Sequence, residues 1–151
     1  MKALIVYDSL YGNTEKVASA LAAGMREGGV GAECVRANAV DVAILGTYDV
    51  LVVGGPTHAF GLSDTMKTFT KRLTEVDLKD KRGFAFDTKM KSRLAGSAGK
   101  KIEQMMKKSG VKVLMSHVSA IVVGREGPLA EGTEERFRQI GTELARLALA
   151  S

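Results

Sequence analysis

The sequence has few of the features that mark secreted or membrane proteins. It contains one cysteine, Cys34, which excludes an internal disulfide and indicates a reducing compartment. No apolar run is long enough to span a membrane. The first apolar run, residues 3–7, is too short for a secretion signal and is followed by no cleavage site. We therefore expect a cytoplasmic protein that has no membrane anchor.

Several nucleotide-binding and repeat signatures are also absent. The chain shows no internal repeat and no low-complexity linker. No Gly-x-Gly-x-x-Gly follows the first expected strand, so the dinucleotide fingerprint is missing. Residues 96–101 faintly resemble a nucleotide P-loop, but Leu94 replaces its first glycine and Lys101 its Ser/Thr. We interpret this segment as the start of a helix, Cys34 as a packed thiol and His117 as a structural residue.

The composition is that of a globular protein with one basic region. A chain of 151 residues with 45% apolar and 26% charged residues predicts a single domain over 1–151. Residues 79–112 hold eleven Lys and Arg against three Asp and Glu, which gives +8 there and −3 elsewhere. Such a face suits an acidic protein, nucleic acid or an anionic membrane, or it only aids solubility. The few aromatic residues among the charges argue against nucleic acid.

Strand-like and helix-like patterns alternate along the chain. The expected strands are 2–7, 32–36, 48–54, 83–86 and an interrupted fifth strand at 111–115 and 121–123. The expected helices are 14–27, a short one near 40–45, two that start at Ser63 and Ser97, and 133–149. This alternation predicts an α/β protein with a doubly wound five-stranded parallel sheet and helices on both faces. Ligands of such sheets bind at the carboxyl ends of the strands, where loops 8–14, 54–61 and 87–96 would meet.

The first of these loops has the composition of a phosphate-binding turn. The free N–H groups at the start of the following helix point into it, and the helix dipole is positive there. Ser9, Tyr11 and Thr14 add O–H donors, Asn13 adds an N–H donor, and Gly12 lets the backbone close around a ligand. The alternative is an ordinary helix start that Asn13 or Thr14 caps.

Two of the loops resemble those of a known family. Residues 9–14, Ser-Leu-Tyr-Gly-Asn-Thr, resemble the phosphate loop of flavodoxins, and residues 54–61 resemble their second, flavin-facing loop. The resemblance extends over essentially the whole chain, at the length of short-chain flavodoxins. It implies the strand order 2-1-3-4-5, with FMN bound where the order reverses.

The resemblance also implies a set of cofactor-binding residues. The phosphate would be held by the first loop: Ser9, Leu10, Tyr11, Gly12, Asn13 and Thr14. One side of the flavin ring would be lined by the second loop: Pro56, Thr57, His58, Ala59, Phe60 and Gly61. The third loop would add Asp87, Thr88 and Lys89. Phe60 or His58 can supply the aromatic wall that a flat ring needs, although His58 could equally be a bystander.

The chain departs from the usual flavodoxin pattern in two ways. Flavodoxins place an aromatic residue in the third loop, whereas this loop offers none beyond Phe86, which belongs to the strand. Flavodoxins are usually acidic, and this chain is basic. We therefore expect a redox partner with an acidic docking surface. We also expect a second flavin reduction step at a less negative potential, because Lys89, Lys91 and Arg93 would border the ring.

Three functions fit these observations. The first is an FMN-dependent electron carrier. The second is an enzyme like the flavodoxin-fold quinone reductases, which take hydride from NAD(P)H, although those proteins have longer insertions. The third is a non-redox module such as a receiver domain, which needs an acidic cluster; Asp8 is present, but the third strand ends in Gly54 and Gly55. The sequence favours the carrier and leaves the oligomeric state open.

Overall fold

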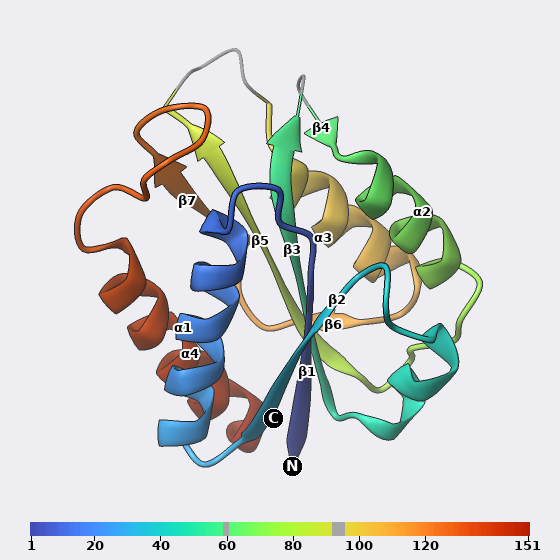
Figure 1. Cartoon of the computed structure of the whole chain (residues 1–151). Helices are drawn as coiled ribbons and strands as arrows, with labels where there is room; N and C mark the ends of the chain where they lie inside the picture. The colour runs from blue at the N-terminus through green and yellow to red at the C-terminus, as the bar shows by residue number, and fades with distance from the viewer. Residues whose placement is uncertain (59–60, 92–95) are drawn as a thin grey trace.

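The protein is a three-layer sandwich, with a central sheet between two pairs of helices (Figure 1). The computed structural model describes residues 1–58, 61–91 and 96–151. Helices α1 (Asn13–Glu27) and α4 (Thr133–Ala150) cover one face of the sheet. Helices α2 (Asp64–Leu73) and α3 (Ala98–Lys108) cover the other face. Both chain termini lie at the opposite end of the sheet from the loops that follow β1, β3 and β5 (Figure 1).

The strands run parallel in the expected order. The path is β2-β1-β3-β5-β6, and β7 also pairs with β5. The bounds of these strands are β1 Lys2–Tyr7, β2 Gly31–Arg36, β3 Val50–His58, β5 Arg82–Met90, β6 Lys112–Val113 and β7 Val118–Val122. The order 2-1-3-4-5 is thus confirmed, with the fifth strand divided into β6 and β7 as the sequence predicts. A two-residue strand, β4 (Gly61–Leu62), pairs antiparallel with β3 and was not predicted, so five strands was an undercount.

Two predicted loops begin later than expected, because β3 and β5 are longer than their apolar runs. The pairing continues through Gly55 with Asp87 and through Pro56 with Thr88. Strand β1 pairs with β3 only as far as Gly54. Pro56 lies beyond this pairing, so its missing N–H removes no hydrogen bond between β3 and β1. The loop predictions for 54–58 and 87–90 are therefore wrong. The two strands extend beyond β1 toward the predicted site.

Helix α4 starts at residue 133 as predicted, and two of the three side-chain caps that the sequence suggests are present. Ser63 caps α2 by accepting a hydrogen bond from the N–H of Met66, and Ser97 caps α3 in the same way with Lys100. Helix α1 differs, because its N-cap is Gly12 in the left-handed conformation and no side chain caps it. The alternative of an ordinary cap by Asn13 or Thr14 is therefore wrong. The short helix near residue 45 is the 3₁₀ helix η1 (Val42–Thr47).

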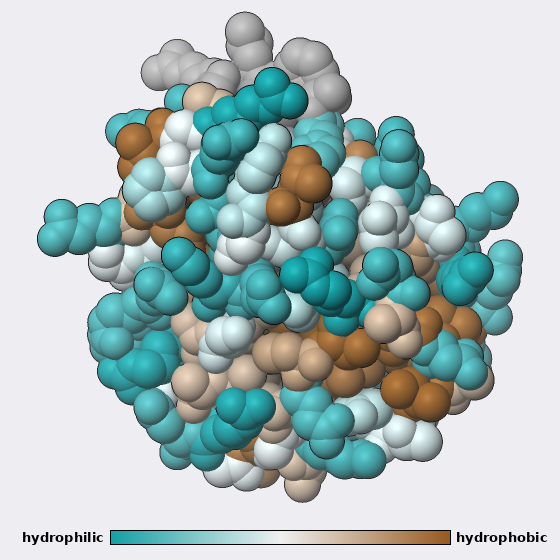
Figure 2. Space-filling view, in the orientation of Figure 1, coloured by the Kyte–Doolittle hydropathy of each residue, from teal (hydrophilic) through white to brown (hydrophobic). Residues whose placement is uncertain are grey.

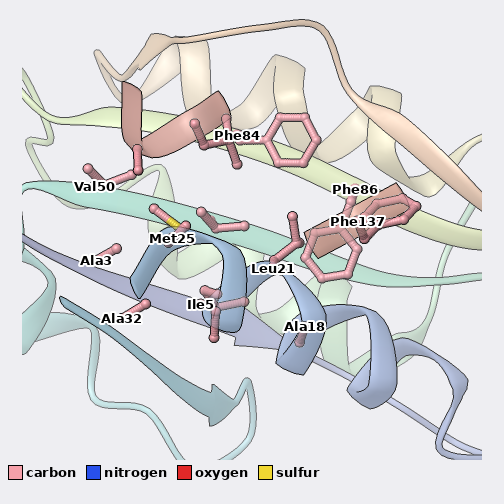
Figure 3. Close-up of a cluster of buried hydrophobic side chains, with 14 of the residues drawn as sticks. Ala3, Ile5, Ala18, Leu21, Met25, Ala32, Val50, Phe84, Phe86 and Phe137 are labelled. Carbon is pink, nitrogen blue, oxygen red and sulfur yellow. The ribbon is translucent and has the colours of Figure 1, made fainter. Parts of the chain in front are cut away.

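The sheet separates two apolar cores. Figure 3 shows the core beneath α1 and α4, where Leu21 and Met25 meet Phe84, Phe86 and Phe137. The rings of Phe86 and Phe137 are 6.4 Å apart and meet edge to face. Phe86 is thus a core residue of the strand, as predicted, and leaves the third loop without an aromatic side chain among its described residues.

The second core lies beneath α2 and α3 and contains the predicted apolar side chains of these helices, Met66, Phe69, Leu73, Ile102 and Met106. Within the described residues, no helix has both the length and the hydrophobicity needed to cross a bilayer.

Candidate functional site

A cavity of about 330 Å³ opens at the carboxyl end of the sheet. It is formed by the turn after β1, the carboxyl ends of β3, β5 and β7, and Arg125 after β7. Its lining comes from the three predicted loops and from a fourth segment: Leu10, Tyr11, Asn13, Thr14, Pro56, Thr57, His58, Thr88, Lys89, Met90, Val122 and Arg125. This volume is in the range of small-ligand sites.

The turn between β1 and α1 presents backbone N–H groups that can bind a ligand. Gly12 has φ of +89°, and a side chain there would meet nothing within 4 Å. The Ser9 hydroxyl oxygen closes the turn by accepting hydrogen bonds from the N–H of Gly12 at 3.0 Å and of Glu15 at 3.4 Å. The amides of Asn13 and Thr14 have no acceptor among the described residues. Unpartnered amides at a helix N-terminus fit a phosphate group.

Neighbouring side chains brace this turn. The Tyr7 hydroxyl donates to Glu15 at 2.9 Å, and Arg36 donates to the carbonyl oxygen of Ser9 at 3.2 Å. The Arg36 guanidinium also lies 5.3 Å from the centre of the Tyr7 ring. Burial, and the hydrogen bond to Glu15, raise the pKa of Tyr7, so its hydroxyl stays a donor at neutral pH. These contacts hold the turn in place.

A buried pair of threonines joins the start of α1 to β5. The hydroxyls of Thr14 and Thr88 are 2.9 Å apart, and both residues also line the cavity. In a pair of hydroxyls only one donates to the other, so the second keeps its hydrogen for another acceptor. The pair can therefore present one O–H donor to a ligand in the cavity.

The opposite wall of the cavity is fixed to the start of α3. Thr57 donates its hydroxyl hydrogen to Asp87 at 3.1 Å and accepts a hydrogen bond from the N–H of Ala98 at 3.0 Å. Lys89 donates from Nζ to the carbonyl oxygen of Gly96 at 3.2 Å, which holds this cation beside the cavity. The arrangement combines a donor-rich turn, a rigid wall and a cation.

Three lining residues, Met90, Val122 and Arg125, were not predicted. Arg125 follows β7 and precedes residues 126–129, a Glu-Gly-Pro-Leu turn to which the sequence assigns no role. This turn packs against the predicted phosphate-binding turn at residues 9–14. Asn13 donates from Nδ2 to the carbonyl oxygen of Glu126 at 3.1 Å. Gly127 also lies against the side-chain amide of Asn13. A β-carbon at Gly127 would lie 2.7 Å from the Asn13 Oδ1. A contact between residues so distant in sequence has no local sequence signal.

The predicted site residues fall into three groups. Those that line the cavity are Leu10, Tyr11, Asn13, Thr14, Pro56, Thr57, His58, Thr88 and Lys89. Those that lie nearby without lining it are Ser9 and Gly12 in the turn, Asp87 behind the wall, and Gly61, which borders a separate hollow with Lys101. Ala59, Phe60 and Arg93 lie outside the described residues.

Two residues that the sequence assigns structural roles lie away from the cavity lining. Cys34 is on the edge strand β2, with its thiol 3.6 Å from the carbonyl oxygen of Ala18. Partial burial of the thiol raises the pKa of Cys34, which disfavours the reactive thiolate. His117 lies between β6 and β7, and its backbone N–H donates to the Glu103 carboxylate of α3 at 2.9 Å. The contact of His117 supports its structural interpretation, whereas the prediction of a packed thiol is wrong, because Cys34 is exposed on β2.

Comparisons with known proteins agree with the fold and with the resemblance. The family described as Flavodoxin matches residues 5–140. A flavodoxin of Clostridium saccharobutylicum is 26% identical over 155 residues, which cover 96% of each chain. Among solved structures, oxidised flavodoxin 1 from Bacillus cereus has a TM-score of 0.86 at 22% identity, covering 97% of this chain and 98% of its own. The flavodoxin of Streptococcus pneumoniae TIGR4 has a TM-score of 0.85 at 23% identity, covering 97% and 99%.

Proposed function

The chain belongs to the flavodoxin family, and from that premise we propose that the cavity at the carboxyl end of the sheet is its FMN site. The protein is an FMN-binding electron-transfer protein of that family, which acts with redox partner proteins. The observation that carries the assignment of the site is the turn of unpartnered amides at the start of α1, which faces this cavity.

Each part of the lining has a role in this proposal. The amides of Asn13 and Thr14 and the threonine pair bind the phosphate, and Arg125 adds a cation near it. Pro56, Thr57 and His58 line one side of the flavin, where backbone groups can reach the edge of the ring. FMN supplies the one-electron chemistry when bound, and the chain holds it and sets its electrostatic surroundings. Ser9 and Gly12 shape the turn.

A visible absorption spectrum tests the proposal. Protein reconstituted with FMN and freed of excess by gel filtration should be yellow, with one flavin per chain. Replacement of Thr57 by tryptophan fills the cavity and should abolish the colour, whereas Thr68→Trp on the exposed face of α2 should not. A Thr57→Trp variant that stays folded and keeps full flavin occupancy would place the flavin elsewhere.

The same sample separates a carrier from an enzyme. An NAD(P)H-dependent quinone reductase would bleach the flavin when NAD(P)H is added under anaerobic conditions. We infer a carrier, because the flavodoxin-fold quinone reductases have longer insertions, whereas residues 8–12 between β1 and α1 and residues 123–132 between β7 and α4 form short connections here. Fast bleaching by NAD(P)H alone would favour the enzyme.

The match over residues 5–140 supports a single domain over 1–151, and the single cysteine supports a cytoplasmic location.

The mouth of the cavity has the composition of a docking surface for an acidic partner. Leu10, Tyr11 and Met90 are 63%, 44% and 46% exposed at its rim. Lys89 and Arg125 line the same cavity, and Lys91 is exposed after β5; Arg82 and Lys112, which also belong to the basic region 79–112, pair at the other end of the sheet, so only part of that region lies near the mouth. Figure 2 shows that hydrophobic residues lie scattered among hydrophilic ones on this part of the surface. A small apolar centre within a charged rim is typical of transient interfaces.

Salt should therefore slow electron exchange with the partner. Attraction between a basic face and an acidic one speeds encounter, and the Debye length falls from about 10 Å at 0.1 M to about 3 Å at 1 M salt. We expect the second-order rate constant from stopped-flow mixing with the reduced partner to fall steadily over this range. A rate constant that is insensitive to salt, or that rises, would mean that the basic face is only solvated.

The basic residues at the carboxyl end of β5, Lys89 and Lys91, should also raise the potential of the second flavin reduction step. A cation about 8 Å away at an effective dielectric of about 20 stabilises an anion by about 2 kcal/mol, or up to about 90 mV for one electron, before screening. Lys89 lines the cavity and Lys91 is exposed beside it, so solvent and salt should reduce this severalfold. Spectroelectrochemistry should show that Lys89→Glu, Lys91→Glu lowers the second potential by about 30 mV or more.

A matched variant separates local from general charge effects. Lys108→Glu, Lys112→Glu changes the net charge equally at the other end of the sheet, where α3 ends and β6 begins, and should leave the potential nearly unchanged. If both double variants shift the potential equally, or neither does, Lys89 and Lys91 do not act on the ring.

A further inference from the structure

Asp87 is a buried carboxylate next to the proposed flavin site. The sequence places it in the third loop as a cofactor-binding residue, but it lies in β5 with 0% of its surface exposed and does not line the cavity. Its Oδ2 accepts three hydrogen bonds, from the Thr57 hydroxyl at 3.1 Å, the Ser97 hydroxyl at 2.7 Å and the Gly99 N–H at 2.9 Å. Its Oδ1 is buried and has no partner among the described residues.

These contacts provide donors but no counter-charge. Two of the donors, Ser97 and Gly99, come from the start of α3, where the helix dipole is positive, and the third, Thr57, comes from β3. Among the described residues, no Lys or Arg lies within ion-pair distance of Asp87. A charge of this kind is screened poorly, because water does not surround it. Its field therefore extends into the neighbouring cavity.

Asp87 is separated from that cavity by one side chain. Thr57 lines the cavity on one side and donates to Asp87 on the other, and the adjacent Thr88 lines the cavity as well. The same Thr57 oxygen accepts from the N–H of Ala98, so carboxylate, wall and helix start form one network. A shift of Asp87 would move both Thr57 and the start of α3.

We propose that Asp87 is a positioning residue for the wall formed by residues 56–58 and that its buried negative charge lowers the reduction potential of the bound flavin. This inference rests on the proposed FMN site. Electrons added to the flavin raise its negative charge, which a fixed carboxylate opposes. Asp87 thus acts against Lys89, and the potential reflects the balance between a buried anion behind the wall and a half-buried cation beside the cavity.

The test compares the FMN-loaded parent with Asp87→Asn, which keeps the shape and removes the charge. At one fixed applied potential, we expect the ratio of fully reduced to one-electron-reduced flavin to rise at least tenfold, which is a shift of 59 mV. Asp77→Asn removes an exposed carboxylate between α2 and β5, at the other end of the sheet, and should change the ratio less than twofold.

A second pair of variants keeps the proposal testable if Asp87→Asn does not fold. Thr57→Val removes the hydroxyl that bonds to Asp87, and Thr57→Ser keeps it. We expect the FMN dissociation constant of the valine variant to exceed that of the serine variant at least fivefold. Equal dissociation constants for these two, or an unchanged ratio of reduced forms in a folded Asp87→Asn, would overturn the role of Asp87. A parent that binds no FMN would overturn the proposed site as well.

Discussion

Gly24→Ala should destabilise the protein, although alanine is the better helix former. A β-carbon at Gly24 in α1 would lie 1.9 Å from the carbonyl oxygen of Arg138 in α4. The approach is mutual, because a β-carbon at Gly141 would lie 2.3 Å from the carbonyl oxygen of Leu21. The Thr142 hydroxyl also donates to the Gly24 carbonyl oxygen at 3.3 Å, so the two backbones meet at this crossing. The added methyl group must push the helices apart.

The steric cost should exceed the gain in helix propensity. Overpacking costs about 3 kcal/mol where backbone atoms block relaxation, whereas alanine gains about 1 kcal/mol over glycine in a helix. The net loss of about 2 kcal/mol corresponds to a fall in melting temperature of about 4–8 °C for a domain of this size. Thermal unfolding followed by circular dichroism measures it. Gly46→Ala is the control, because a side chain there meets nothing within 4 Å. Equal melting temperatures for the two variants would contradict the close crossing.

The fold could be predicted from the sequence because its local signals agree with one another. Apolar runs locate the strands, Ser63 and Ser97 locate two helix starts, and the interruption between residues 115 and 121 corresponds to the break between β6 and β7. The end of β3 was missed because Gly55 and Pro56 are typical of a turn. The end of β5 was missed with it, because Asp87 and Thr88 pair with these two residues. The position of β3 beyond the end of β1, which makes Pro56 tolerable, is a property of the whole sheet.

The site could be predicted only in part, because some of its contacts depend on the whole sheet and have no local sequence signal. The turn at 9–14 is local, and its composition indicates its chemistry. Asn13 and Glu126 are in contact although they lie 113 residues apart in the chain. Only the packed sheet brings this turn, and Arg125 beside it, to the site. Asp87 was assigned to the ligand loop because the longer β5 was not recognised. Gly24 and Gly141 did carry a signal, because a glycine inside an amphipathic helix indicates close packing.

FMN should bind far more tightly than riboflavin, which lacks the phosphate. The turn offers two unpartnered amides, and the Thr14–Thr88 pair offers one further donor. Hydrogen bonds to a charged group contribute about 1.5–3 kcal/mol each. Even two of them amount to at least 3 kcal/mol, so we expect riboflavin to bind at least about 100-fold more weakly in calorimetric titration. We expect a preference over FAD as well, because the turn suits the terminal phosphate of FMN, which FAD does not have. Equal affinity for FMN and riboflavin would mean that the turn only starts a helix.

Thr14→Ala identifies the phosphate as the group that the turn recognises. The substitution removes the Thr14 hydroxyl and should weaken FMN binding by about 1.5–3 kcal/mol, which is about 10- to 150-fold. Riboflavin affinity should change much less, because the lost partner is the phosphate. Thr14→Ser keeps the hydroxyl beside Thr88 and should retain most of the FMN affinity. If alanine weakens FMN and riboflavin equally, Thr14 supports the cavity only through packing, since a phosphate contact can affect only the ligand that carries a phosphate.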